Sequence, residues 1–141
     1  MATVSASGAD AGRLILDTGG LLAWAIGEQR AREAVLRAVH RGMPIVVPTV
    51  VIARVIRGGP RDAPINQALK QIQQFPVVTP LLARQAGVLL GATETTDVVD
   101  AVVVAEALRQ LPATILTSDP ADIRRLAIST SAHARVQILP V

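Results

Sequence analysis

Short apolar runs alternate along this chain with longer stretches in which hydrophobic and polar residues are mixed. The apolar runs, each bounded by turn or polar residues, predict buried strands at 13–17, 44–47, 75–79, 114–117 and 136–140. Helical spacing and capping residues predict helices at 21–26, 28–41, 49–58, 62–74, 81–91, 97–110 and 120–127. Strands that alternate with helices indicate an α/β fold, in which helices cover a central parallel sheet of about five strands.

A single domain accounts for this pattern, because 141 residues are enough to bury one substantial core. The stretch 1–12, MATVSASGADAG, is small and polar, so we expect a flexible N-terminal extension followed by a domain at 13–141. It lacks the basic and apolar regions of a signal peptide. No later apolar run reaches about 18 residues without a charge or a proline. We therefore expect a soluble, cytoplasmic protein that does not enter a membrane.

The composition restricts the core and the ligand. Half of the residues are hydrophobic, but Trp24 and Phe75 are the only aromatic ones. An aliphatic core of this kind suits a parallel sheet covered on both faces. So few aromatic rings disfavour a surface that binds single-stranded bases by stacking. The chain has no cysteine, which excludes disulfides and thiolate metal sites.

The charge balance is compatible with an acidic ligand. The net charge is +3, and all of the 14 basic residues except Lys70 are arginines. The guanidinium group matches phosphate and carboxylate groups, so a nucleic acid and an acidic protein are both candidate ligands. A GC-rich genome would enrich a chain in arginine, alanine and valine in the same way, and composition does not decide between these origins.

Four aspartates, Asp17, Asp97, Asp100 and Asp119, stand where a predicted strand ends or a predicted helix begins. In open parallel sheets, ligands bind at the carboxyl ends of strands where the strand order reverses. If their strands are neighbours, Asp17 and Asp119 face one crevice, and such carboxylates suit Mg²⁺ or Mn²⁺. Helix capping, at about 1 kcal/mol each, is the alternative for Asp97 and Asp119, and the helix dipole is the alternative for Asp100 and Asp122. Neither explains Asp17, because it ends an apolar strand and needs a partner for its charge.

Four sequence blocks follow one another in an order that is typical of one family. They are LILDTGGLLAW, VVPTVVIARVIRGG, TTDVVDAVVVAEA and ILTSDPADIRRLA. From about residue 13 to residue 141 the chain resembles the PIN domain, specifically VapC-type toxins of bacterial toxin–antitoxin systems. The strings DVVDA and TSDPADI carry the most specific part of this resemblance.

The resemblance implies a three-layer α/β/α PIN-like fold and an endoribonuclease that depends on Mg²⁺ or Mn²⁺ and cuts structured RNA, commonly transfer RNA. It also implies a VapB-type antitoxin as partner and a homodimer. The residues that match the catalytic, metal-binding positions are Asp17, Asp100 and Asp119, with Asp97 as a neighbour that coordinates directly or through water. Thr18 and Ser118 match small hydroxyl positions that steady the carboxylates.

Arg54 departs from the family pattern. The pattern has a glutamate three residues before the Arg-Gly that ends this helix, and here Arg54 stands before Arg57-Gly58. One interpretation is that the cation repels a metal and pairs with an aspartate, an effect of about 4 kcal/mol for unit charges about 4 Å apart at an effective dielectric of about 20. The second is that Arg54 clamps the scissile phosphate. The third is that the helix rotates and Arg54 reaches solvent.

Other side chains receive weaker predictions. Arg57 and Arg61 are candidate contacts for RNA or for the partner, Arg124 and Arg125 form either a solvated helix face or a contact, His40 and His133 are expected at the surface, and Trp24 is expected in the core or at the antitoxin interface.

Three functions remain to be distinguished. The first is the metal-dependent endoribonuclease toxin. The second is a catalytically weakened PIN domain that binds RNA or its antitoxin, because Arg54 replaces an acid. The third, a receiver-like domain phosphorylated on an aspartate, is disfavoured because a receiver needs a late lysine and Lys70 is the only lysine.

Overall fold

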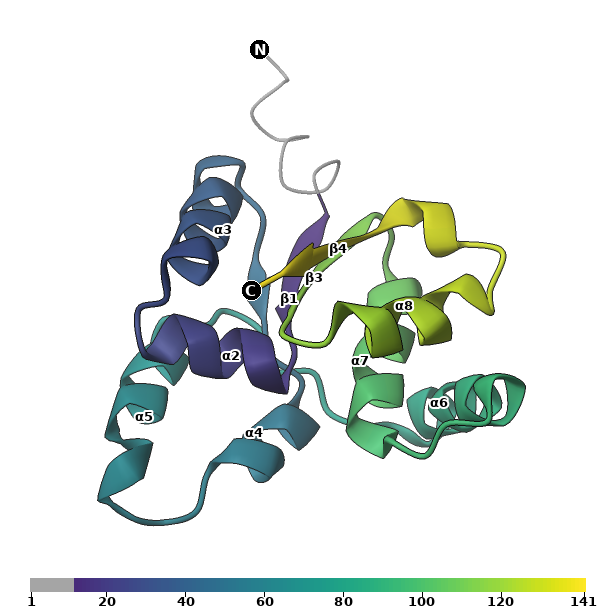
Figure 1. Cartoon of the computed structure of the whole chain (residues 1–141), viewed down its shortest axis with the longest axis horizontal. Helices are drawn as coiled ribbons and strands as arrows, with labels where there is room; N and C mark the ends of the chain where they lie inside the picture. The colour runs from purple at the N-terminus through teal and green to yellow at the C-terminus, as the bar shows by residue number, and fades with distance from the viewer. Residues whose placement is uncertain (1–11) are drawn as a thin grey trace.

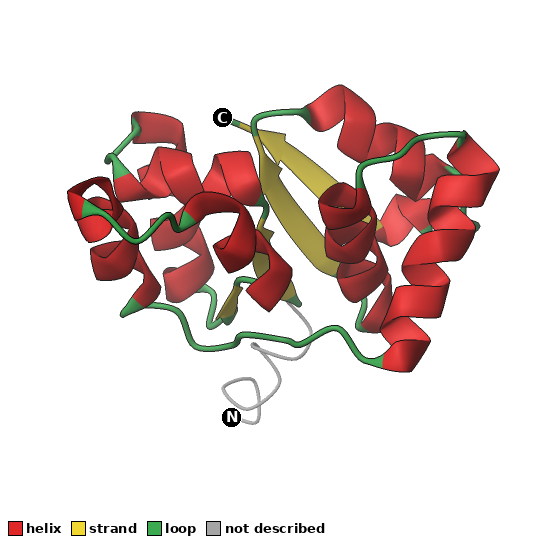
Figure 2. Ribbon diagram, turned by 90° about the horizontal axis from the view of Figure 1, so that it is seen from below, coloured by secondary structure: helices red, strands yellow, loops and turns green. Residues whose placement is uncertain are grey.

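A central parallel sheet lies between two layers of helices (Figures 1 and 2), in a computed structural model that describes residues 12–141. The strands are β1 (Arg13–Leu16), β2 (Ile45–Val46), β3 (Ala113–Thr117) and β4 (Val136–Pro140). Their order in the sheet is β2-β1-β3-β4, and every pair is parallel. The predicted three-layer α/β/α fold is therefore confirmed. The predicted N-terminal extension, apart from residue 12, lies outside the described residues.

The helices of the described chain are α2 (Thr18–Ala25), α3 (Gln29–His40), α4 (Thr49–Val55), α5 (Ala63–Leu69), α6 (Pro80–Thr93), α7 (Val98–Arg109) and α8 (Pro120–Ile128), with short 3-10 helices η1 (Pro60–Asp62) and η2 (His133–Arg135). Helices α2 to α5 lie on one side of the sheet and α6 to α8 on the other (Figure 1). No helix of residues 12–141 has the length and apolar character needed to cross a membrane.

The core is built around the two central strands and α7. Every residue of β1 and of β3 is buried, because each strand has a neighbour on both sides and helices above and below. Residues 101–107 of α7 are also all buried. A helix that is apolar on every side is typical of a fully enclosed position, and α7 packs against β1, β3, α6 and α8.

A buried ion pair joins the start of β1 to the end of α7. Arg13 and Glu106 are each 1% exposed, and the Arg13 Nη1 lies 2.6 Å from the Glu106 Oε2. The second terminal nitrogen of Arg13 donates to the Glu106 carbonyl oxygen at 2.8 Å. Arg109, at the surface, also donates to the Glu106 carboxylate. The pair therefore fixes a strand and a helix whose other ends carry Asp17 and Asp100.

The predicted strand at 75–79 is wrong. The segment before it runs beside β2 and forms one bridge, between Val46 and Gln74, with a 3.0 Å hydrogen bond from the Val47 N–H to the Gln74 carbonyl oxygen. Pro76 accepts a hydrogen bond through its carbonyl oxygen but has no N–H to donate. The pairing therefore stops there, and the described sheet has four strands in place of the predicted five.

Two predicted helices are shorter in the structure. The helix expected at 49–58 ends at Val55, where Ile56 takes an extended conformation. The helix expected at 62–74 is reduced to α5, which directly follows η1 and ends at Leu69. Asp62 explains part of this change, because its buried carboxylate accepts the N–H groups of Arg57 and Gly58 and so holds the intervening chain as a loop.

Candidate functional site

The ends of β1 and β3 bring Asp17 and Asp119 to the same edge of the sheet. The two strands are neighbours with Leu16 opposite Leu116, and the Asp17 N–H donates to the Leu116 carbonyl oxygen at 3.2 Å. From β1 the chain continues to β2 on one side, while β3 lies on the other side, so the strand order reverses between β1 and β3. The expectation that these strands are neighbours at the reversal is confirmed, and this is where open parallel sheets bind ligands.

Asp17 is 3% exposed and forms the N-cap of α2, so the expectation that helix capping does not apply to Asp17 is wrong. Its Oδ1 accepts a hydrogen bond of 2.8 Å from the Gly20 N–H. Burial raises the pKa of Asp17, and the charge of Asp119 raises it further, whereas hydrogen bonds from the Thr117 hydroxyl and from the backbone lower it. A cation close to this carboxylate would therefore stabilise its ionised form.

Helix α2 approaches β3 so closely that two of its positions accept only glycine. A Cβ at Gly20 would lie 2.2 Å from the Leu116 carbonyl oxygen, and a Cβ at Gly19 would lie 1.8 Å from the Ser118 Oγ. The contact at Gly20 is with the backbone of a central strand, which has no room to move. The helix predicted at 21–26 instead begins at Thr18, so Thr18 and the two glycines form its first turn and hold Asp17 against β3.

The start of α7 supplies the third side of the site. Asp97 is the N-cap of α7, and its Oδ1 accepts the Asp100 N–H at 3.0 Å. Asp100 is partly buried. Burial raises the pKa of Asp100 to about 7, the charges of Asp97, Asp17 and Asp119 contribute in the same direction, and Arg54 opposes them. Three of the predicted aspartates thus affect the ionisation of the fourth.

Asp100, Asp119 and Asp122 form an acidic cluster, with one carboxylate oxygen from each within 4.8 Å of the others. Asp119 precedes α8, but its side chain makes no capping hydrogen bond, so the capping interpretation of Asp119 is wrong. A hydrogen bond with Asp119 and the charge of Asp119 raise the pKa of Asp122. Sequence reasoning treated Asp122 only as a first-turn acid. Its spacing of three residues from Asp119 is the signal that could have placed both side chains together.

A cleft of about 270 Å³ lies beside this cluster. Its walls include Asp97, Asp100 and Asp122, together with Arg125 of α8. A different cleft of about 280 Å³ is lined mainly by apolar residues of α6 and α7 and by no acid. The first cleft is the candidate site, because it combines concave shape with clustered acids and a cation.

Arg54 pairs with Asp97 between α4 and α7. The Arg54 Nη1 lies 3.0 Å from the Asp97 Oδ1, and the Nη2 lies 3.1 Å from the Oδ2. Hydrogen bonds from Arg54 lower the pKa of Asp97. The side chains of Arg54 and Asp97 are 43% and 37% exposed, so the pair lies at the rim of the site. Pairing with an aspartate is the interpretation that is observed, and the interpretation in which Arg54 only reaches solvent is wrong.

The hydroxyl group of Thr117 lies at the site. It accepts the Asp119 N–H at 2.8 Å, and its hydrogen bonding lowers the pKa of Asp17. The Thr18 hydroxyl oxygen is buried without a hydrogen-bond partner among residues 12–141, and Ser118 is exposed with its Oγ close to Gly19. Sequence reasoning missed Thr117 because it treated this residue only as the last position of the strand at 114–117 and gave its hydroxyl no role.

The loop after α4 presents Arg57 and Arg61 at the surface. Asp62 is 5% exposed and accepts the N–H groups of Arg57 and Gly58 at distances between 2.6 and 3.2 Å. The base of the loop is therefore held rigidly, next to the helix that carries Arg54.

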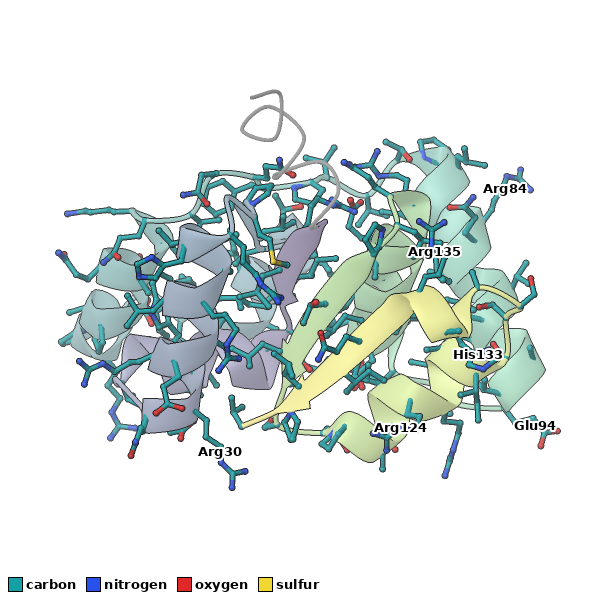
Figure 3. All side chains as sticks on the ribbon, turned by 90° about the horizontal axis from the view of Figure 1, so that it is seen from above. Arg30, Arg84, Glu94, Arg124, His133 and Arg135 are labelled. Atoms are coloured by element: carbon teal, nitrogen blue, oxygen red, sulfur yellow. The ribbon has the colours of Figure 1, made fainter. Side chains whose placement is uncertain are left out.

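Both histidines are exposed, as expected, and the Nδ1 of His133 lies 3.0 Å from the Thr130 carbonyl oxygen. Arg124 and His133 lie on the outside of the molecule (Figure 3). Trp24 is partly buried against the core. The side chains of Arg124, His133 and Trp24 belong neither to the acidic cluster nor to the wall of the candidate cleft.

No protein-family model matches this sequence, and no curated protein matches it either. Among solved structures, the chain is similar to a chain in the crystal structure of VapBC2 from Rickettsia felis bound to a DNA fragment from their promoter. The TM-score is 0.64 and the sequence identity 12%, over 91% of this chain and 98% of that chain. Similarity at this level of identity concerns the fold. The protein therefore has the PIN-like fold of VapC-type toxins that its sequence motifs resemble.

Proposed function

We propose that this protein is a metal-dependent endoribonuclease, the toxin of a toxin–antitoxin pair. One observation carries the proposal: Asp17, Asp100, Asp119 and Asp122 gather where the strand order reverses, in a fold shared with a chain of VapBC2. Mg²⁺ or Mn²⁺ is the proposed cofactor, because hard divalent cations prefer oxygen ligands and retain some of their waters.

The donor set fits such a cation. Ligand oxygens lie about 2.0–2.1 Å from Mg²⁺, so oxygens on opposite sides of one ion are about 4 Å apart. The oxygens of Asp100, Asp119 and Asp122, within 4.8 Å of one another, need only small side-chain movements to reach this spacing. Asp17 adds a buried carboxylate that the Gly20 N–H already orients.

When bound, the ion would activate a water molecule and stabilise the leaving oxygen of the phosphodiester. The protein's own residues provide the positioning. Asp17 and Asp97 are held by helix N-termini, and the Asp97 cap orients the turn that carries Asp100. Arg125 in the cleft wall is proposed to bind a phosphate of the RNA. Arg57 and Arg61 are proposed to bind phosphates farther along the strand.

A VapB-type antitoxin is the proposed protein partner, by extension from the VapBC2 complex. The apolar side chains of Leu22 and Trp24 on α2 and of Ile26 at its C-cap are candidates for this contact, since Leu22 and Ile26 are exposed and Trp24 is only partly buried. We also propose that the protein forms a homodimer, acts in the cytoplasm and cuts structured RNA, with transfer RNA as the first substrate to test.

The experiment is a cleavage assay with total transfer RNA on purified protein freed of antitoxin, with Mg²⁺, with Mn²⁺ and with EDTA. Asp17→Asn and Asp119→Asn test the site. Glu33→Gln is the matched control, because Glu33 is exposed on α3 and, among residues 12–141, its side chain accepts a hydrogen bond only from Gln29. Cleavage should need the metal, survive in Glu33→Gln and disappear in both aspartate variants. If the RNA stays intact with Mg²⁺ and also with Mn²⁺, the proposed nuclease activity is refuted.

The pairing of Arg54 with Asp97 favours a second candidate, a PIN domain that binds RNA or its antitoxin without efficient cleavage. In this case a cation occupies the rim of the site and offsets one of its acids. The same samples distinguish the two functions in a gel-shift assay. Retained binding of uncut RNA supports the binding module, whereas turnover supports the enzyme.

A further inference from the structure

The ion pair with Arg54 uses most of the hydrogen-bonding capacity of the Asp97 carboxylate. The Asp97 Oδ1 accepts from the Arg54 Nη1 at 3.0 Å and from the Asp100 N–H at 3.0 Å, and the Oδ2 accepts from the Arg54 Nη2 at 3.1 Å. A carboxylate offers about four lone-pair sites. The one that remains lies beside a guanidinium group, whose positive charge repels any further cation.

Asp97 also stands outside the group of acids that come together. The oxygens within 4.8 Å of one another belong to Asp100, Asp119 and Asp122. Arg54 and Asp97 together add no net charge to the rim. A neutral residue in place of Arg54 would leave the Asp97 carboxylate unpaired and add one negative charge close to Asp100.

We propose that Arg54 withdraws Asp97 from metal binding, so that the site holds one divalent cation per chain on Asp100, Asp119 and Asp122, beside the buried Asp17. Asp97 is then a positioning residue: it orients the first turn of α7 through the Asp100 N–H, and Arg54 holds Asp97 in place. The inference rests on the proposed function, because it requires that the acidic cluster binds a cation.

The test is Mn²⁺ binding to the full chain, freed of metal and antitoxin, measured by calorimetry and by electron paramagnetic resonance of the free ion. The decisive variant is the double substitution Arg54→Gln with Asp97→Asn, which removes both charges and keeps an amide oxygen for the Asp100 N–H. We expect one Mn²⁺ per wild-type chain. The double variant should also bind one, with a Kd within about threefold, as is typical when an exposed pair is removed.

Two further single variants should change the Mn²⁺ affinity, in opposite directions. Arg54→Gln alone releases the Asp97 carboxylate and should lower the Kd about tenfold, equivalent to about 1.4 kcal/mol of binding free energy. Asp119→Asn should weaken binding strongly, because it removes a ligand. If the amide at position 97 disturbs the fold in thermal melts, Asp97→Ser combined with Arg54→Gln replaces it, since serine is also a good N-cap.

The inference is overturned if the double variant loses Mn²⁺ affinity as strongly as Asp119→Asn does, because Asp97 would then be a ligand. It is also overturned if Arg54→Gln leaves the Kd unchanged. In both outcomes the wild type binds Mn²⁺. A wild type that binds no Mn²⁺ contradicts the proposed metal-dependent function itself, so the two failures are distinguishable.

Discussion

The buried pair between Arg13 and Glu106 leads to a quantitative prediction about stability. In Glu106→Gln the guanidinium of Arg13, 1% exposed, keeps its hydrogen bond to the carbonyl oxygen of residue 106 but loses the charge that compensates it. Removal of one partner from a buried ion pair costs about 3–5 kcal/mol. That is a large part of the about 5–15 kcal/mol by which domains are stable.

The assay is urea denaturation followed by circular dichroism, with thermal melts as a second measure. At about 3 °C per kcal/mol for a chain of this size, Glu106→Gln should lower the Tm by about 10–15 °C. Arg109→Gln is the matched control, because Arg109 contacts the same carboxylate from a side chain that is 53% exposed. Its loss should cost about 1 kcal/mol or less.

A third variant separates charge from packing. Arg13→Met combined with Glu106→Leu removes both charges and retains similar volumes, and such replacements are often neutral or stabilising. If Glu106→Gln costs less than about 1 kcal/mol, or if the double variant is as unstable as Glu106→Gln, the uncompensated charge is not the cause and the reasoning is refuted.

Three further predictions concern the site. Gly20→Ala should destabilise the fold by about 1–3 kcal/mol, because its Cβ would lie 2.2 Å from the Leu116 carbonyl oxygen. Gly87→Ala, which has open space around it, should stabilise the fold by about 0.5–1 kcal/mol in the same urea assay. Equal effects of the two substitutions would contradict the close approach of α2 to β3. Burial raises the pKa of Asp100 from 3.8 to about 7, so the folded protein binds a proton there more tightly than the unfolded chain does. Without metal, Asp100 therefore contributes fully to stability below pH 3.8, and this contribution is lost as the pH rises through about 7. Solvent screening limits this change to about 1–2 kcal/mol, and a stability profile between pH 5 and 8 that is as steep in Asp100→Asn as in the wild type would refute it. Mn²⁺ at about 100 times its Kd should stabilise the wild type by about 2.7 kcal/mol, and an equal rise in the Tm of Asp119→Asn would count against the cluster as the binding site.

The local sequence was sufficient to predict the strands and the helix that are buried on all sides. The runs that form β1 and β3 are buried throughout and mostly apolar, since both strands are central in the sheet, and the same holds for residues 101–107 of α7. The buried charges of Arg13 and Glu106 in these elements pair with each other. The local sequence was insufficient to predict the structure at the edge of the sheet. The run at 75–79 has the composition of a strand, but Pro76 has no N–H to extend the single bridge beside β2.

The same division holds in the candidate site. Asp17 was identified from sequence because a charge at the end of an apolar strand needs an explanation, and Asp100 from its place in a specific motif. Thr117 was missed because the last residue of an apolar run looks like part of the core until the neighbouring strand end is known. Asp122 was treated as a helix-dipole residue because the nearness of Asp100 depends on how α7 packs against α8.

The sequence by itself determined the alternation of strands and helices, the aliphatic core and the positions of four acids relative to the ends of those elements. These properties depend on residues close together in the chain. Only the tertiary structure decided which side chains meet: that Arg54 holds Asp97, that Asp119 and Asp122 lie beside Asp100, and that Asp17 lies beside β3. Each of these contacts joins separate elements, so it is set by the strand order and by the packing of helices against the sheet.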